Sequence, residues 1–144
     1  MGRRGPGLDI EDQTRYTNRA NVTRMRPNRD LCITNITRGT QLAARARVAA
    51  GFWERLVGLL GRRSLAPGEG LVITPCRSVH TLFMRFTIDV VYVDRSTTVV
   101  KTVPKLKPFR TSVAERAAHS AIELPSGTIS DTQTIAGDRL AFSQ

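Results

Sequence analysis

The sequence has only two cysteines, two histidines and one tryptophan in 144 residues, and it has no run of about 20 apolar residues that could span a bilayer. Cys32 and Cys76 are too few for a zinc cage built from Cys alone or for a disulfide-framed fold. No apolar stretch follows the twin arginines Arg3 and Arg4, so no export signal is predicted. We therefore expect a soluble, cytoplasmic protein with reduced thiols and no metal or cofactor.

Positive charge is abundant, because 22 Lys and Arg oppose 12 Asp and Glu and the formal net charge is +10. Residues 1–30 hold seven of the arginines, and their apolar residues follow neither a helical nor a strand period. The pattern predicts a disordered arginine-rich arm over 1–30, followed by one β-rich domain over 31–144. Such an arm could bind nucleic acid or an anionic membrane. Nucleic acid is not expected as the partner, since Tyr16 is the arm's only aromatic residue for base stacking.

Short apolar or alternating segments separated by turn residues predict strands through most of the remaining chain. Residues 80–94 are rich in β-branched and aromatic side chains and predict a central strand pair. A helical stripe occurs only where Phe52, Trp53, Leu56, Leu59 and Leu60 recur at spacings of three and four. We expect a mainly β (β-rich α+β) fold, either a small antiparallel β-sandwich or a partly open barrel, with one short covering helix.

The densest group of reactive side chains follows Pro75, where Cys76, Ser78 and His80 lie within five residues. If this stretch is extended, Cys76 and His80 are about 13 Å apart, and only a turn lets them act together. Asp89 lies on the same strand face as apolar residues and therefore needs a partner, for which Arg85 is the predicted ion-pair donor. A ligand cleft floored by Asp89 and Arg85 and rimmed by Cys76, Ser78 and His80 is one hypothesis.

A second hypothesis uses the same residues for catalysis, with Cys76 as nucleophile, His80 as base and Asp89 as the group that orients the imidazole. Neither a glycine-rich elbow nor an oxyanion-hole signature precedes Cys76, and a buried cysteine is often only a small hydrophobic residue. Cys76, His80 and one carboxylate lack the two close ligand pairs of zinc sites, so no metal site is predicted.

All three lysines, Lys101, Lys105 and Lys107, fall within seven residues, and Arg110 follows them. The cluster could contact an acidic partner or a phosphate. Lysines beside prolines also protect the edge strand of a sheet from unwanted pairing, and this structural interpretation is the one we favour.

Several spaced motifs resemble the uncharacterised DUF192 family, a domain of unknown function, over about residues 35–140. They are Arg55-x2-Gly58-Leu59-Leu60, Gly70-Leu71, Pro75-Cys76-x3-His80-Thr81-x-Phe83-Met84-Arg85-x2-Ile88-Asp89, Asp94, Ile122-Glu123-Leu124-Pro125-x-Gly127 and Gly137-Asp138. The resemblance implies a small, mainly β domain of sandwich type, found in bacteria and archaea, with no established activity, substrate or cofactor. It also implies that many relatives carry an export or lipoprotein leader, so localisation is left open.

The sequence therefore favours a non-enzymatic binding or accessory module that recognises a small ligand or an extended peptide. The alternatives are a cysteine hydrolase or thiol-transfer enzyme that uses Cys76, His80 and Asp89, and a protein that binds nucleic acid or anionic membrane through its amino-terminal arm.

Overall fold

The computed structural model describes residues 29–49 and 62–144. The predicted arm, up to residue 28, and the predicted helix over residues 52–61 lie outside this part of the chain. The elements in chain order are β1 (Leu31–Asn35), β2 (Thr40–Ala49), β3 (Glu69–Ile73), β4 (Ser78–His80), β5 (Ile88–Val93), β6 (Val99–Leu106), β7 (Thr111–Val113), β8 (Ser120–Pro125), α3 (Thr128–Thr132) and β9 (Leu140–Ser143).

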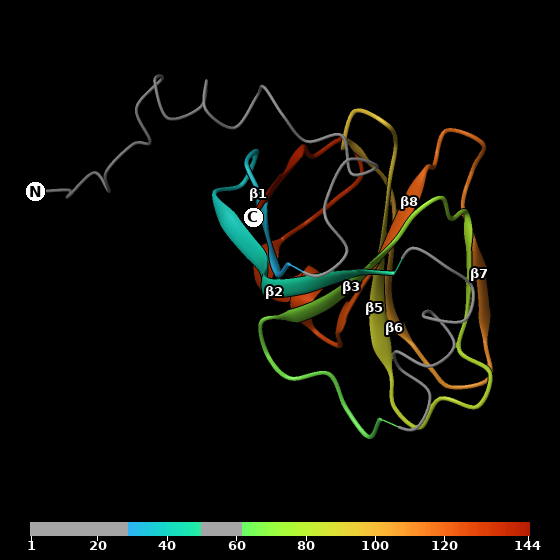
Figure 1. Cartoon of the computed structure of the whole chain (residues 1–144). Helices are drawn as coiled ribbons and strands as arrows, with labels where there is room; N and C mark the ends of the chain where they lie inside the picture. The colour runs from blue at the N-terminus through green and yellow to red at the C-terminus, as the bar shows by residue number, and fades with distance from the viewer. Residues whose placement is uncertain (1–28, 50–61) are drawn as a thin grey trace, which may run out of the picture.

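Seven strands form one sheet in the order β6-β5-β8-β3-β2-β1-β9, and β4 and β7 form a separate two-stranded sheet. The large sheet curls into a half-barrel (Figure 1). At one end its two edges meet, because the Leu140 N–H donates to the Thr97 carbonyl and the Val99 N–H donates to the Asp138 carbonyl. The prediction of a β-rich, partly open barrel is confirmed. The strands are not all antiparallel as expected, since β2 and β3 pair in parallel.

The alternation of side chains along β5 explains why both faces of the sheet are covered. Val91 and Val93 face a core inside the curl, while Ile88, Val90 and Tyr92 face a second core on the outside. The outer core is closed by residues from the β4 region, including Val79 and Met84. A strand that is buried on both faces has a nearly continuous apolar sequence, and in β5 this sequence is interrupted by Asp89.

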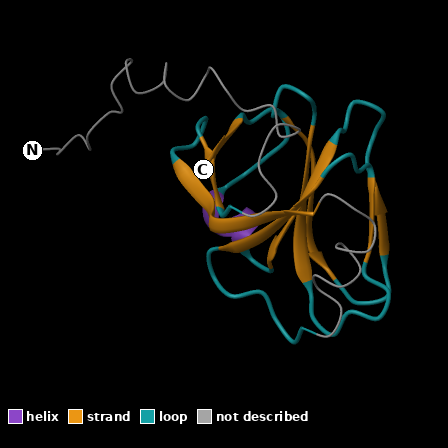
Figure 2. Ribbon diagram, viewed as in Figure 1, coloured by secondary structure: helices purple, strands orange, loops and turns teal. Residues whose placement is uncertain are grey.

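The helix α3 was not predicted, because the only helical stripe recognised in the sequence lies over residues 52–60. Gly127 supplies the left-handed φ of 97° that starts this five-residue helix. α3, the helix coloured purple in Figure 2, packs against β2, β5 and β6, and Ile129 joins the core inside the curl. No helix within residues 29–49 and 62–144 is long and apolar enough to cross a bilayer.

The segment 80–94 is not the strand pair that its composition predicts. β5 is an interior strand of the large sheet, but residues 81–87 form a loop with a turn and a bend, and β4 pairs with β7 instead of β5. β-propensity alone cannot locate this break. Phe83 adopts a left-handed backbone conformation with φ 63°, and such a conformation is usually indicated by a glycine, which is absent here.

The lysine cluster lies at an edge of the large sheet, as the interpretation of edge protection predicts. β6, which contains Lys101 and Lys105, is an edge strand of the seven-stranded sheet. Charged residues and Pro104 on this strand disfavour pairing with another chain.

One buried tyrosine joins the two sheets and provides a test of this layering. The Tyr92 hydroxyl donates to the Ser112 carbonyl over 3.0 Å, whereas the buried Ser112 Oγ makes no hydrogen bond in the part of the chain that the structure describes. We expect Tyr92→Phe to lower the free energy of unfolding by about 1–2 kcal/mol. Ser112→Ala should leave it unchanged or slightly higher, because it removes an unsatisfied group. Urea unfolding of both variants measures this, and equal losses would contradict the assignment.

Candidate functional site

Three loops come together at one end of the large sheet because their strands are neighbours. Ile73 at the end of β3 pairs with Ala121 of β8, and Val93 at the end of β5 pairs with Ser120 of β8. Since β8 runs antiparallel to both, the loop that enters β8 lies between the loops that leave β3 and β5. Residues 74–77, 94–98 and 115–119 therefore form one surface.

This surface contains a solvent-open hollow of about 710 Å³, within the usual size range of small-molecule sites. The three loops contribute ten lining residues, Pro75, Cys76, Arg77, Asp94, Arg95, Ser96, Arg116, Ala117, Ala118 and His119.

His119 is held in place by its backbone. Its N–H donates to the Val93 carbonyl, and its carbonyl accepts the Cys76 N–H, both at 2.8 Å. The next residue, Ser120, donates a hydrogen bond from its hydroxyl to Thr74 Oγ1 at 2.9 Å. These bonds fasten the β8 entry to both neighbouring loops, so the half-buried His119 starts from a fixed backbone position at the hollow.

The charge of the hollow is predominantly positive. Arg77, Arg95 and Arg116 are exposed, and each comes from a different one of the three loops. Asp94 is the one carboxylate among the ten lining residues, and its Oδ1 accepts the N–H groups of Ser96 and Thr98 at 2.8 and 3.0 Å. This Asp94 oxygen is thereby engaged in holding the turn that carries Arg95.

Cys76 is at the inner wall of the hollow. Its side chain belongs to the outer core and is 6% exposed. The thiol donates a hydrogen bond to the Ser78 carbonyl at 3.0 Å. This environment favours a packing role for Cys76 over that of an exposed thiolate nucleophile.

The other residues of the predicted cleft lie elsewhere. Ser78 and His80 are exposed on the short strand β4, and Arg85 is exposed in the loop before β5. Asp89 is fully buried in β5. Of the five residues, only Cys76 lines the hollow, and the structure does not bring Cys76, His80 and Asp89 together.

Asp89 binds backbone amides. Its Oδ1 accepts the Lys105 N–H at 2.9 Å, and its Oδ2 accepts the Ile129 N–H at 2.8 Å. Lys105 lies in a bulge of β6, where φ is 52° and the register with β5 shifts, so its amide is available for a side-chain acceptor. Ile129 is in the first turn of α3, whose own N-cap residue, Gly127, offers no side-chain acceptor. Asp89 thus connects the edge strand β6 and the helix α3 to β5.

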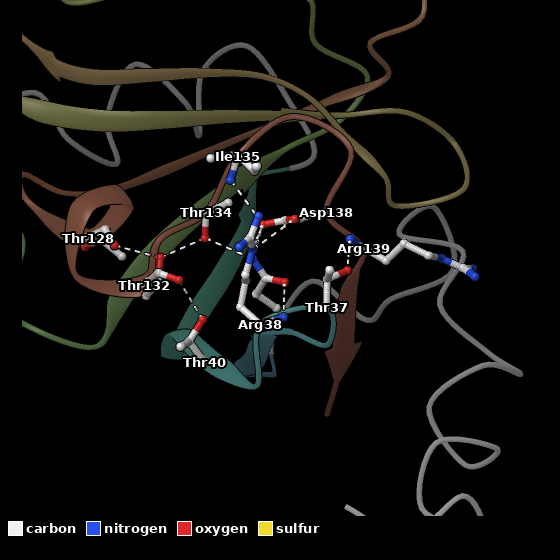
Figure 3. A network of polar contacts seen from close by, with 10 residues as sticks. Thr37, Arg38, Thr40, Thr128, Thr132, Thr134, Ile135, Asp138 and Arg139 are labelled. Atoms are coloured by element: carbon white, nitrogen blue, oxygen red, sulfur yellow. Dashed lines mark hydrogen bonds and ion pairs between the residues drawn. The ribbon is translucent and has the colours of Figure 1, made fainter. Parts of the chain in front are cut away.

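A second buried carboxylate, Asp138, holds the segment before β9 against the end of β1 and the turn that follows it (Figure 3). It accepts hydrogen bonds from Asn35 Nδ2 at 2.9 Å, from Arg38 Nε at 3.1 Å and from the Ile135 N–H at 3.1 Å. Burial alone would raise the pKa of Asp138, but the hydrogen bonds from Asn35, Arg38 and Ile135 outweigh it and lower the pKa below its usual value. Among the described residues the ion pairs are Arg38–Asp138 and Arg62–Glu69, so Arg85 is not the partner of Asp89.

Sequence reasoning missed the cationic residues and the histidine of the hollow, namely Arg77, Arg95, Arg116 and His119. Nothing in the local sequence indicates that residues 94–96 adjoin residues 116–119 and Cys76. Within residues 29–49 and 62–144, no three His, Cys, Asp or Glu side chains are grouped so that they could hold a metal ion.

Comparison with known proteins places this fold in a family. The family model DUF192, described as "Uncharacterized ACR", matches residues 33–142. The chain belongs to the DUF192 family. Among its DUF192 relatives are the UPF0127 protein of Pyrococcus furiosus, which is 34% identical over 76% of this chain and 97% of its own, and that of Pyrococcus abyssi, which is 31% identical over 76% and 96%.

The DUF192 resemblance seen in the sequence is thus confirmed. A solved structure shares the fold at low sequence identity. The crystal structure of a protein of unknown function from Novosphingobium aromaticivorans superposes with a TM-score of 0.66 at 17% identity, over 77% of this chain and 82% of that one.

Proposed function

We propose that this protein is a ligand-binding module whose site is the hollow around Cys76 and His119, and that its ligand is a small molecule carrying a phosphate or carboxylate group. The observation that carries the proposal is that Arg77, Arg95 and Arg116 reach one hollow from three loops. Guanidinium groups match the planar oxygens of phosphates and carboxylates. Their convergence favours a compact anion with several oxygens.

The rigid attachment of the three loops supports binding without large rearrangement. The loops are joined to each other through His119 and Thr74, and Asp94 fixes the turn of Arg95. A site held by its backbone loses little conformational entropy when a ligand binds. The buried, hydrogen-bonded thiol of Cys76 favours this binding function over covalent catalysis.

Titration calorimetry of the full chain with pyrophosphate and citrate tests the proposal, with glucose as a neutral probe. We expect saturable binding of one of the two anions, weakened by salt, and none of glucose. Arg95→Gln and Arg116→Gln should each weaken binding about tenfold or more, because each removes a charge-assisted contact.

The matched control is the pair Arg45→Gln and Arg47→Gln, two exposed arginines of β2 that do not line the hollow. They change the net charge equally and should leave affinity within about twofold, as expected for screened distant charges. Equal losses in both sets would mean unspecific attraction to a basic protein. Absence of saturable binding by either anion would overturn the proposal.

A further inference from the structure

A second exposed feature lies outside the hollow, in the turn after β4 and the loop before β7. Leu82, Phe83 and Phe109 are 44%, 72% and 57% exposed, and we call them the Phe patch. The rings of Phe83 and Phe109 are in edge-to-face contact, with centroids 5.9 Å apart and planes at 72°. Two mostly exposed phenylalanines in mutual contact form an apolar surface patch of the kind that marks interaction sites.

The Phe patch is held in place by buried contacts. Phe83 and Phe109 have positive φ angles of 63° and 58°, which are unfavourable for bulky residues. The carbonyl of the fully buried Thr81 accepts the N–H groups of Met84 and Phe109 at 3.2 and 2.9 Å. Its hydroxyl donates to the Lys107 carbonyl at 2.6 Å and accepts the Arg110 N–H at 3.0 Å. One residue thereby fixes both loops so that the two rings stay exposed side by side.

The segments that carry the Phe patch have charged residues of one sign. The segments 77–88 and 100–114, which carry the patch, contain six Lys or Arg and no Asp or Glu. Arg85, Lys107 and Arg110, which flank the patch residues in sequence, are all exposed. A partner of this surface must therefore combine negative charge with an apolar layer.

Anionic lipid bilayers and single-stranded nucleic acids both combine these properties, and the geometry separates them. Successive bases stack on ring faces that they can reach in sequence, whereas these two rings are steeply inclined and pack edge to face. Leu82 adds an aliphatic side chain that offers no stacking surface. Phenylalanine and leucine with flanking cations are instead suited to the boundary between headgroups and acyl chains. We propose that the Phe patch docks this domain on an anionic membrane surface, with Lys107 and Arg110 at the lipid headgroups.

Co-sedimentation of the full chain with vesicles tests the proposal. We expect binding to phosphatidylcholine vesicles that contain phosphatidylglycerol at about one part in three and much weaker binding to phosphatidylcholine alone, since each cation near an anionic surface favours binding about fivefold. Phe83→Asn with Phe109→Asn should lower the partition coefficient at least about tenfold. Asparagine tolerates positive φ, so this variant should remain folded.

Two controls keep the test specific. Ile135→Asn removes an exposed apolar side chain outside the patch, 53% exposed, and should not change binding. Lys107→Gln with Arg110→Gln should weaken binding about 30-fold, and Arg45→Gln with Arg47→Gln should weaken it far less. Vesicle binding that survives the Phe83/Phe109 substitution in a folded protein would overturn the proposal and assign binding to other charged segments. Binding of oligothymidylate that depends on the two phenylalanines, without vesicle binding, would also overturn it.

Discussion

Replacing Asp89 with alanine should lower the free energy of unfolding by about 3–5 kcal/mol, the largest loss we expect from any single side chain of this protein. The substitution removes the acceptor of two amides, Lys105 N–H and Ile129 N–H, and leaves a cavity beside a fully buried strand. Loss of one residue therefore loosens both the bulge of β6 and the first turn of α3.

Arg85→Ala is the matched comparison. If Asp89 were held by an ion pair with Arg85, this substitution would lower the stability strongly, whereas it should have little effect if Asp89 is held by backbone amides. Arg85 is exposed, so its removal should change the stability by less than about 0.5 kcal/mol. Asp89→Asn keeps the shape but can accept only one of the two amides well, and should give an intermediate loss. Urea unfolding of the three variants measures this. Similar losses for Arg85→Ala and Asp89→Ala would show that the carboxylate depends on the arginine.

Asp138 should make the stability depend on pH at the acid end. Its pKa is lowered in the folded protein, so the unfolded chain, with an aspartate pKa of about 3.9, takes up the proton more readily. The stabilisation is present above the unfolded pKa and is lost as pH falls through the folded pKa. We expect Asp138→Asn to cost about 2–4 kcal/mol near neutral pH, because Arg38 and Asn35 lose a charged acceptor.

The pH dependence provides the control for this second prediction. Unfolding free energies measured between about pH 3 and pH 6 should converge for the wild type and Asp138→Asn as the pH falls. Glu69, whose pKa is lowered first by the Ala66 amide and also by Arg62, contributes an acid dependence of the same sign in both proteins, so the difference isolates Asp138. Parallel curves over this range would contradict the role assigned to its carboxylate.

Local patterns predicted the strands well where each strand has simple surroundings. Among the short apolar or alternating segments of the sequence, residues 42–48 lie in β2 and residues 71–73 lie in β3, and β1 and β2 pair as an antiparallel hairpin. The segment 80–94 was wrong as a strand pair, because the backbone of Phe83 turns under constraint from Thr81 and residues 107–110, and these contacts are distant in sequence.

The sequence could indicate only part of the site, because the site depends on the pairing of strands that are distant in sequence. The sequence correctly indicated that Asp89 needs a partner. The actual donors are main-chain amides, which no side-chain pattern identifies. The sequence gives no reason to assign His119 to a site, because its position at the hollow depends on β8 lying between β3 and β5. Arginines of three separate turns can be recognised as one group only after the order of the strands is known.

The closure of the curl has a consequence for biosynthesis. Asp138, which lies just before β9 and accepts the Val99 N–H at the closure, is 103 positions from its side-chain partner Asn35 in β1, and β9 supplies the pairing for the free side of β1. Residues 137–143 are translated after the other strands that the structure describes, at about 5–20 residues per second. Until they leave the ribosome, the nascent chain displays unpaired β1 amides and carbonyls, which are a template for association with neighbouring chains. Slow translation just before this segment would therefore favour aggregation, whereas rapid delivery of β9 would suppress it.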